Sequence, residues 1–358
     1  MPDIKEVYEM VTKESPPKPD ALERQRKRQL RTTRNKRIGA FAVAAAIVAA
    51  AAVLVIRTAG ESAPKQPAVP GPATETPTGP FFLDLRTGEM TPLPESLTPD
   101  TSLGTKIFAY YDASPDGTKI AYNTCRSFSC SGADVMTVAN IDGTVVRTLD
   151  VPEDLNGYAP RWSPDGSKLV YQLRNGATND VGNLVVQDTF NLFTADPLLW
   201  QTTQVTDLEL SAGWWFLSAS FGPGGRDVIF HLPRTSTSTT EWDVWSVPVT
   251  GGEPTLVLRN AQFPLYFPDG EEIAFVQPAP SSLGGSSIRI ADAQGTRRTL
   301  VEANDSIWHP AMSPDGSRIA YRDGSYVYVV DVSTSESQQV ATGDNAAWLD
   351  DDTLIVSP

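Results

Sequence analysis

Histidine and cysteine, which supply many metal ligands and catalytic bases, are nearly absent from this chain of 358 residues. The two histidines, His231 and His309, are 78 residues apart, a separation that predicts neither a zinc site nor a His-centred triad. The sequence also lacks a G-x-S-x-G nucleophile elbow, an H-E-x-x-H motif and a phosphate-binding glycine loop. We therefore predict no catalytic residue, no metal site and no cofactor.

The two cysteines, Cys125 and Cys130, stand close together in the stretch CRSFSC. Two thiols are too few for a four-cysteine zinc site. They form a short-loop disulfide if this part of the chain lies outside the cytoplasm, where disulfides persist. Otherwise they are two small, half-buried thiols.

Positive charge is scarce after the first 37 residues. Residues 1–37 carry 11 Lys and Arg against 6 Asp and Glu, whereas the rest of the chain carries 18 against 37. Such an acidic body repels phosphates, so we predict no nucleic-acid partner. The asymmetry indicates that the two parts of the chain face different surroundings.

One long uncharged run, IGAFAVAAAIVAAAAVLVI at residues 38–56, stands out in the N-terminal sequence. As a helix it reaches about 28 Å, close to the ~30 Å hydrocarbon core of a bilayer. Eight Lys and Arg in residues 24–37 precede it, and the positive-inside rule then places the N-terminus in the cytoplasm. The alternative, a cleaved signal peptide, has a much shorter basic segment before its apolar core. We predict a retained single-pass anchor in the cell membrane, with everything after it outside the cytoplasm.

Two further segments flank this anchor. Residues 57–80 contain six prolines and no apolar periodicity, which is typical of an extended stalk. In the tail, residues 1–37, the capping box DIKE predicts the start of a short amphipathic helix. A helix of this length is only marginally stable by itself in water. Its apolar face consists of Ile4, Val7, Tyr8 and Val11. That face docks on a cytoplasmic protein or on the lipid surface, or it is unfolded; its acidic residues favour a protein.

From residue 81 onwards no stretch favours a helix, and one turn motif occurs six times. Its intact copies, such as WSPDG at 162–166, precede an apolar strand. The first turn position falls at residues 114, 163, 222, 267, 313 and 349. Ser, Pro and Asp suit successive positions of a type I turn, and Gly takes the left-handed conformation that closes a hairpin. A second strand pair follows most copies, so each repeat predicts a four-stranded propeller blade.

The two ends of this region each contain part of one repeat. The sixth turn is followed by a single strand, and FFLDLRTGEMTPL at 81–93 is a strand pair without a turn motif before it. Together they have the length of one repeat. We therefore predict an all-β, six-bladed β-propeller over residues 81–358, in which the C-terminal strands complete the blade begun by the N-terminal strands. This closure leaves no exposed sheet edge.

The repeats resemble those of TolB-like (WD-repeat-like) bacterial six-bladed propellers, whose hallmark is the Ser-Pro-Asp-Gly turn followed by an IAY-type strand. The resemblance covers residues 81–358 and implies the fold rather than an activity. The N-terminal α/β domain of TolB is replaced here by the predicted anchor and stalk, so the resemblance does not imply a Tol–Pal transport role. The order of basic tail, anchor and outer propeller resembles that of membrane-anchored anti-sigma-like and sensor proteins.

Function is expected on the face opposite the tight turns, because its connections are longer and less even. We predict that the channel mouth on this loop face binds a protein, a peptide or a glycan. The residues expected there are Tyr158, Trp214, Trp215, Trp308 and His309. Each has a structural alternative, since aromatic residues also pack between blades and a histidine before a proline can be purely structural.

The sequence thus favours an extracytoplasmic binding module, a sensor or anti-sigma-like protein, over an enzyme. Two alternatives stay open. One is a structural scaffold of the cell envelope, and the other is an envelope hydrolase or lyase that uses carboxylates of the channel.

Overall fold

The computed structural model describes residues 77–98, 108–125, 136–149, 155–175, 189–199, 201–208, 218–234, 241–279 and 285–358. The predicted tail, the predicted membrane segment and nearly all of the predicted stalk lie outside these residues, so the anchor stays a prediction. Among the residues that are described, no helix is long and apolar enough to cross a membrane.

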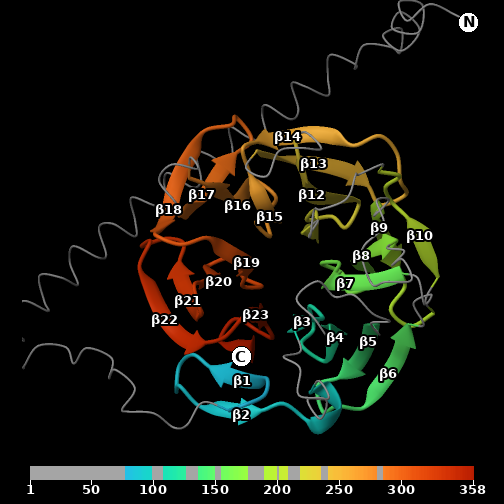
Figure 1. Ribbon diagram of the computed structural model, residues 1–358, viewed down its shortest axis with the longest axis vertical. Coiled ribbons are helices and arrows are strands. Elements are labelled where there is room, and N and C mark those ends of the chain that lie inside the picture. Colours follow the sequence, from blue (N-terminus) through green and yellow to red (C-terminus); the bar gives the residue numbers. More distant parts are fainter. Residues whose placement is uncertain are drawn as a thin grey trace, which may run out of the picture. The chain divides into compact units, whose positions relative to one another are not determined.

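Six antiparallel sheets of four strands surround a central axis, which confirms the predicted six-bladed propeller (Figure 1). Blade 1 contains β3 (Phe108–Ala113), β4 (Lys119–Cys125), β5 (Met136–Asn140) and β6 (Val145–Leu149). Blade 2 contains β7 (Leu155–Trp162), β8 (Leu169–Asn175), β9 (Thr189–Ala195) and β10 (Thr202–Gln204). Blade 3 contains β11 (Ala219–Phe221), β12 (Asp227–Pro233), β13 (Trp242–Pro248) and β14 (Thr255–Arg259).

The remaining blades follow in chain order around the axis. Blade 4 contains β15 (Gln262–Tyr266), β16 (Glu272–Pro278), β17 (Ser286–Asp292) and β18 (Arg297–Ala303). Blade 5 contains β19 (Ile307–Met312), β20 (Arg318–Asp323), β21 (Tyr326–Asp331) and β22 (Ser337–Thr342). Blade 6 contains β23 (Asn345–Trp348), β24 (Thr353–Ser357), β1 (Phe81–Asp84) and β2 (Met90–Pro92). A single 3₁₀ turn, η1 (Glu95–Leu97), follows β2.

Blade 6 is closed by strands from both ends of the propeller region. β24 lies between β1 and β23, and Phe81 is paired with Val356 and Leu83 with Leu354. The predicted ring closure is therefore confirmed. Leu354 and Val356 are fully buried, because β24 has a sheet neighbour on each side and packs against blade 5 on one face.

The second strand of a blade has a continuous buried run, as its apolar sequence predicts. In β12 the run Val228–His231 is buried throughout, whereas the outermost strand β22 exposes most of its residues. A strand between two neighbouring sheets buries both faces, so it reads as a continuous apolar run. The core is therefore a set of apolar layers between adjacent blades.

The recurrent turn has the predicted conformation. Gly166 has φ +70° and donates its N–H to Ser163 O at 2.9 Å. The side chain of Ser163 adds bonds that the turn type alone does not require: its Oγ donates to Asp165 Oδ1 at 2.6 Å and accepts the Lys168 N–H at 2.9 Å. This explains why serine begins the intact copies.

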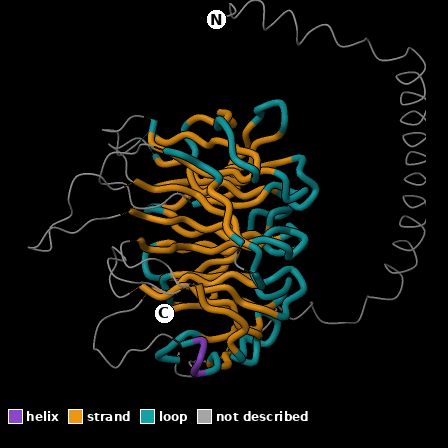
Figure 2. Tube along the Cα trace, turned by 90° about the vertical axis from the view of Figure 1, so that its right-hand side faces the viewer, coloured by secondary structure: helices purple, strands orange, loops and turns teal. Residues whose placement is uncertain are grey.

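Neighbouring turns touch one another around the axis. A Cβ atom placed on Gly316 of blade 5 would lie 2.7 Å from Pro268 Cδ in the turn of blade 4. Between blades 5 and 6, the Asp315 N–H donates to Asp351 Oδ1 at 2.9 Å. The tight turns thus line one rim of the channel, on the side where Figure 2 shows many of the described turns. We call this side the turn face.

Candidate functional site

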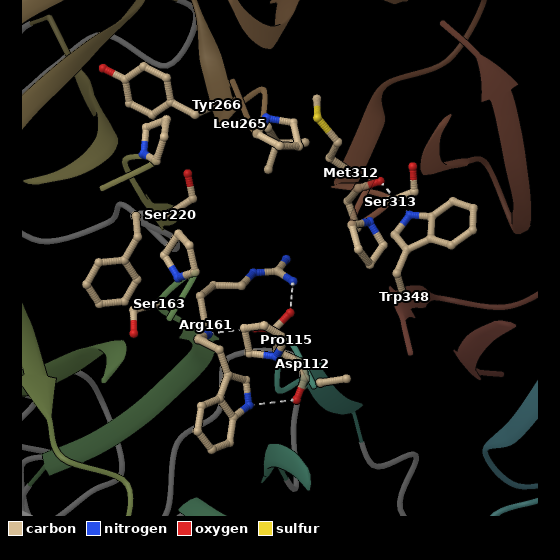
Figure 3. Close-up of a pocket in the computed structure, with 18 of the residues that line it drawn as sticks. Asp112, Pro115, Arg161, Ser163, Ser220, Leu265, Tyr266, Met312, Ser313 and Trp348 are labelled. Carbon is tan, nitrogen blue, oxygen red and sulfur yellow. Dashed lines mark hydrogen bonds and ion pairs between the residues drawn. The ribbon is translucent and has the colours of Figure 1, made fainter. Parts of the chain in front are cut away.

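A pocket opens at the channel mouth on the turn face, with a volume of about 400 Å³. Its rim carries the second residue of five successive turns. These residues are Pro115, Pro164, Pro223, Pro268 and Pro314. Below them, the inner strands contribute residues that lie two positions before each turn. Those lining the pocket are Asp112, Arg161, Ser220, Leu265 and Ala311. We call this cavity the turn-face pocket (Figure 3).

An ion pair between blades 1 and 2 supplies the charge of the turn-face pocket. Arg161 Nη1 lies 3.1 Å from Asp112 Oδ1, and each side chain is 19% exposed. The second carboxylate oxygen of Asp112 accepts the Trp162 backbone N–H at 2.7 Å, and the Trp162 indole N–H donates to Asp112 O at 3.2 Å. Burial raises the pKa of Asp112, and the Arg161 charge opposes that rise. Figure 3 shows the guanidinium at the pocket beside the Asp112 carboxylate. Among the described residues its hydrogen bond is the one to Asp112 Oδ1, and a guanidinium has five N–H donors, so other donors can serve a ligand.

The channel narrows to a constriction deeper along the axis. There the residue four positions before each turn approaches the axis and leaves a cavity of only about 20 Å³. The residues of this constriction are Tyr110, Ala159, Ser218, Phe263, His309 and Asn345. A space of that size holds about one water molecule. The turn-face pocket therefore has a floor.

Three of the inner strands have the same backbone irregularity, a bulge with positive φ, where they line the constriction. Ala159, Phe263 and His309 have φ of 44°, 49° and 50°, each stands directly before a proline, and the strand register shifts at each site. A residue with positive φ at a bulge redirects its strand. The dipeptide X-Pro four residues before the turn is a sequence signal for this feature, and our sequence analysis missed it.

His309 is part of the constriction and is packed among aromatic rings. Its ring centroid lies 5.2 Å from that of Tyr110 and 6.1 Å from that of Phe263. Burial, the largest cause, and the positive charges of Arg161 and Arg322 together lower the pKa of His309 to about 3. The imidazole is therefore neutral at physiological pH.

Of the other residues predicted for the loop face, the structure describes some and not others. Trp308 is 39% exposed and its ring centroid lies 5.7 Å from that of Phe263, next to the constriction. Tyr158 lies in β7 opposite Gln172, but its side chain is outside the described residues. Trp214 and Trp215 lie outside them altogether. The loop-face binding site therefore stays a prediction.

The predicted disulfide and the predicted tail helix are likewise not described. Cys125 ends β4 without a described side chain, and Cys130 lies outside the described residues. The same holds for the predicted apolar face of the tail, which consists of Ile4, Val7, Tyr8 and Val11.

The titration of His309 gives the first prediction. Between its folded pKa of about 3 and its unfolded value near 6.5, the unfolded chain binds more protons, so the free energy of unfolding rises with pH and levels off above 6.5. We expect this group to account for a loss of about 2 kcal/mol between pH 7 and pH 5. His309→Asn should remove that loss, since Asn does not titrate and tolerates positive φ. Urea unfolding of both proteins at the two pH values measures it; the same pH dependence in both would contradict a neutral His309.

Comparison with known proteins adds information about the fold. No protein-family model matches the sequence, and no curated protein is significantly similar to it. A provisionally assigned TolB of Agrobacterium tumefaciens is 16% identical with a TM-score of 0.53, over 78% of this chain and 96% of the other. TolB of Acinetobacter baumannii is 19% identical with a TM-score of 0.47, over 78% and 63%. Oligogalacturonate lyase of Vibrio parahaemolyticus is 12% identical with a TM-score of 0.45, over 78% and 96%. The first of these supports the TolB-like propeller fold, and at such identities the likeness extends to the fold alone.

Proposed function

We propose that this protein is a non-catalytic binding module that takes part of a partner molecule into the turn-face pocket. One observation carries the proposal: the pocket has the constriction below it and holds the Arg161 guanidinium, paired with Asp112, among prolines and aromatic residues. Concave sites with mainly apolar walls and a few placed polar groups are typical of ligand recognition.

The chemistry of Asp112 favours recognition over catalysis. Its charge is compensated by Arg161, and one of its oxygens is held by the Trp162 N–H. Glycoside hydrolysis needs two carboxyl groups on either side of the bond that breaks. Of the described residues that line the turn-face pocket, Asp112 is the only one with a carboxyl group. The hydrolase alternative is therefore less well supported than binding.

The location of the module is part of the same proposal. The predicted anchor at 38–56 and the stalk at 57–80 would hold the propeller outside the cell membrane. The predicted tail helix would then engage a cytoplasmic protein. The predicted loop-face site of Tyr158, Trp214, Trp215, Trp308 and His309 is a second candidate place for a partner.

Binding of the full chain to peptide and oligosaccharide arrays tests the proposal. The variant Asp112→Asn/Arg161→Met removes both charges but keeps an oxygen that accepts the Trp162 N–H. We expect it to weaken binding of any ligand found by about 10- to 100-fold, since hydrogen bonds to charged groups contribute about 1.5–3 kcal/mol. Arg298→Met is the control, because Arg298 is 46% exposed and pairs with Glu272 on the outer part of blade 4. Equal affinity of the two variants would overturn the proposal.

A further inference from the structure

A groove between the turns of blades 1 and 2 continues outward from the turn-face pocket. It has a volume of about 380 Å³ and shares Pro115, Trp162 and Pro164 with the turn-face pocket. Its outer end is formed by Pro197 and Leu198, in the turn between β9 and β10. We call it the blade 1–2 groove. The two cavities share three lining residues and therefore lie next to each other, so a single extended ligand that crosses these residues can reach both.

Leu198 at the outer end of the groove is exposed to solvent, and so is the next residue, Leu199, which lies beside the groove and outside its lining. Leu198 is 55% exposed and Leu199 is 64% exposed. Asp196 fixes this arrangement, because its Oδ1 accepts the backbone N–H groups of both leucines at 2.8 Å. The matching turn of blade 4 is the small, polar stretch AQGT at 293–296. Adjacent exposed leucines held by a rigid turn beside a groove are typical of an interaction surface.

The polar groups of the groove are already engaged within their own turns. Asp116 Oδ1 accepts from Ser114 Oγ at 2.5 Å, from the Thr118 N–H at 3.1 Å and from Thr118 Oγ1 at 2.8 Å. Asp165 is held in the same way by the corresponding serines. These contacts hold the two carboxylates in place, and they leave each carboxylate its negative charge. Apolar contact and net charge are what the groove offers.

The net charge of the groove is negative. Asp116 and Asp165 face one basic side chain, Lys119. The same turn hydrogen bonds lower the pKa of both carboxyls, that of Asp116 to about 2, so both stay ionised at neutral pH. Charge complementarity therefore favours a ligand with a basic side chain at this place.

We propose that the blade 1–2 groove and the turn-face pocket together hold an extended peptide of a partner protein, with apolar side chains against the two leucines and a basic side chain beside the turn carboxylates. This inference rests on the proposed binding function and names the ligand class. The peptide would enter the turn-face pocket with its other end, next to Arg161.

Three pools of fluorescein-labelled decapeptides, tested on the full chain by fluorescence anisotropy, examine this proposal. One pool combines Leu, Pro, Ala and Lys, the second replaces Lys by Glu, and the third combines Ser, Gly and Lys. We expect the first pool to bind at least tenfold more tightly than the others and to weaken several-fold between 0.05 M and 0.5 M salt. Leu198→Ser/Leu199→Ser should cost about tenfold in affinity, since each leucine loses part of its apolar contact.

Val145→Ser/Val146→Ser is the matched control. It replaces two exposed apolar residues of β6 that are 49% and 37% exposed and line neither cavity. Equal affinity of this control and the leucine variant, or preference for the acidic or polar pool, would overturn the peptide proposal. So would a change of sedimentation coefficient in the leucine variant alone, which would identify a second copy of this chain as the occupant. Loss of binding in the Asp112→Asn/Arg161→Met variant but not in the leucine variant would leave the turn-face pocket in place and remove the groove.

Discussion

Deleting residues 353–358, which include all of β24, should abolish the folded propeller. Leu354, Ile355 and Val356 are at most 1% exposed, and the strand carries the backbone pairing of both β1 and β23. Burying each such side chain contributes about 1.5–3 kcal/mol, so the three together approach the about 5–15 kcal/mol that stabilises a typical domain. Near-ultraviolet circular dichroism and urea unfolding of the full-length and shortened chains measure the effect.

Removal of Pro358 alone is the control, because this residue lies beyond β24. Addition of a synthetic peptide with the sequence of residues 349–358 should restore the near-ultraviolet signal to the shortened chain. A cooperative transition at an unchanged urea midpoint in the shortened chain would mean that the ring does not depend on its closing strand.

Gly316→Ala should destabilise the propeller by about 2–5 kcal/mol. The backbone at this glycine has φ +76°, which costs an L-residue about 1–2 kcal/mol. A new Cβ would also lie 2.7 Å from Pro268 Cδ, and such overpacking adds about 1–3 kcal/mol. Urea unfolding gives the difference in free energy.

Gly295→Ala separates these two costs. Gly295 has nearly the same backbone conformation, φ +78°, but a Cβ there would meet nothing within 4 Å. We expect it to lose only the about 1–2 kcal/mol of the backbone change. Equal losses at the two glycines would show that contact between neighbouring turns adds nothing to stability.

The architecture of the propeller was predictable because its signal is repeated. The turn motif pairs Pro164, which presets φ, with Gly166, which adopts positive φ, and an apolar strand follows each time. Six copies at similar spacing fix the blade count, and the incomplete repeats at 81–93 and 349–358 indicate the closure. Each copy of the motif encodes its own turn, so the intact copies reveal the repeat even where other copies have changed.

The turn-face pocket was not predictable in the same way. Asp112 and Arg161 belong to different blades, and nothing in the local sequence pairs them. From the sequence, function is expected on the loop face, since uneven loops usually carry it. The turn-face pocket depends instead on the size of the residue that each inner strand places two positions before its turn. Small residues such as Ala311 and Ser220 stand there among larger ones and leave space for the pocket. That is a property of the whole ring, so it is recognised only when the six copies are aligned.

The position of β24 also determines when the protein can finish folding. Its partner β1 begins at Phe81, so the pairing of Phe81 with Val356 must wait until nearly the whole propeller has left the ribosome. Until then the first blades have apolar faces without neighbours, and contacts this distant in sequence form slowly. Blade 6 is therefore the last to assemble, and chains whose synthesis stops early should be aggregation-prone substrates for chaperones and proteases.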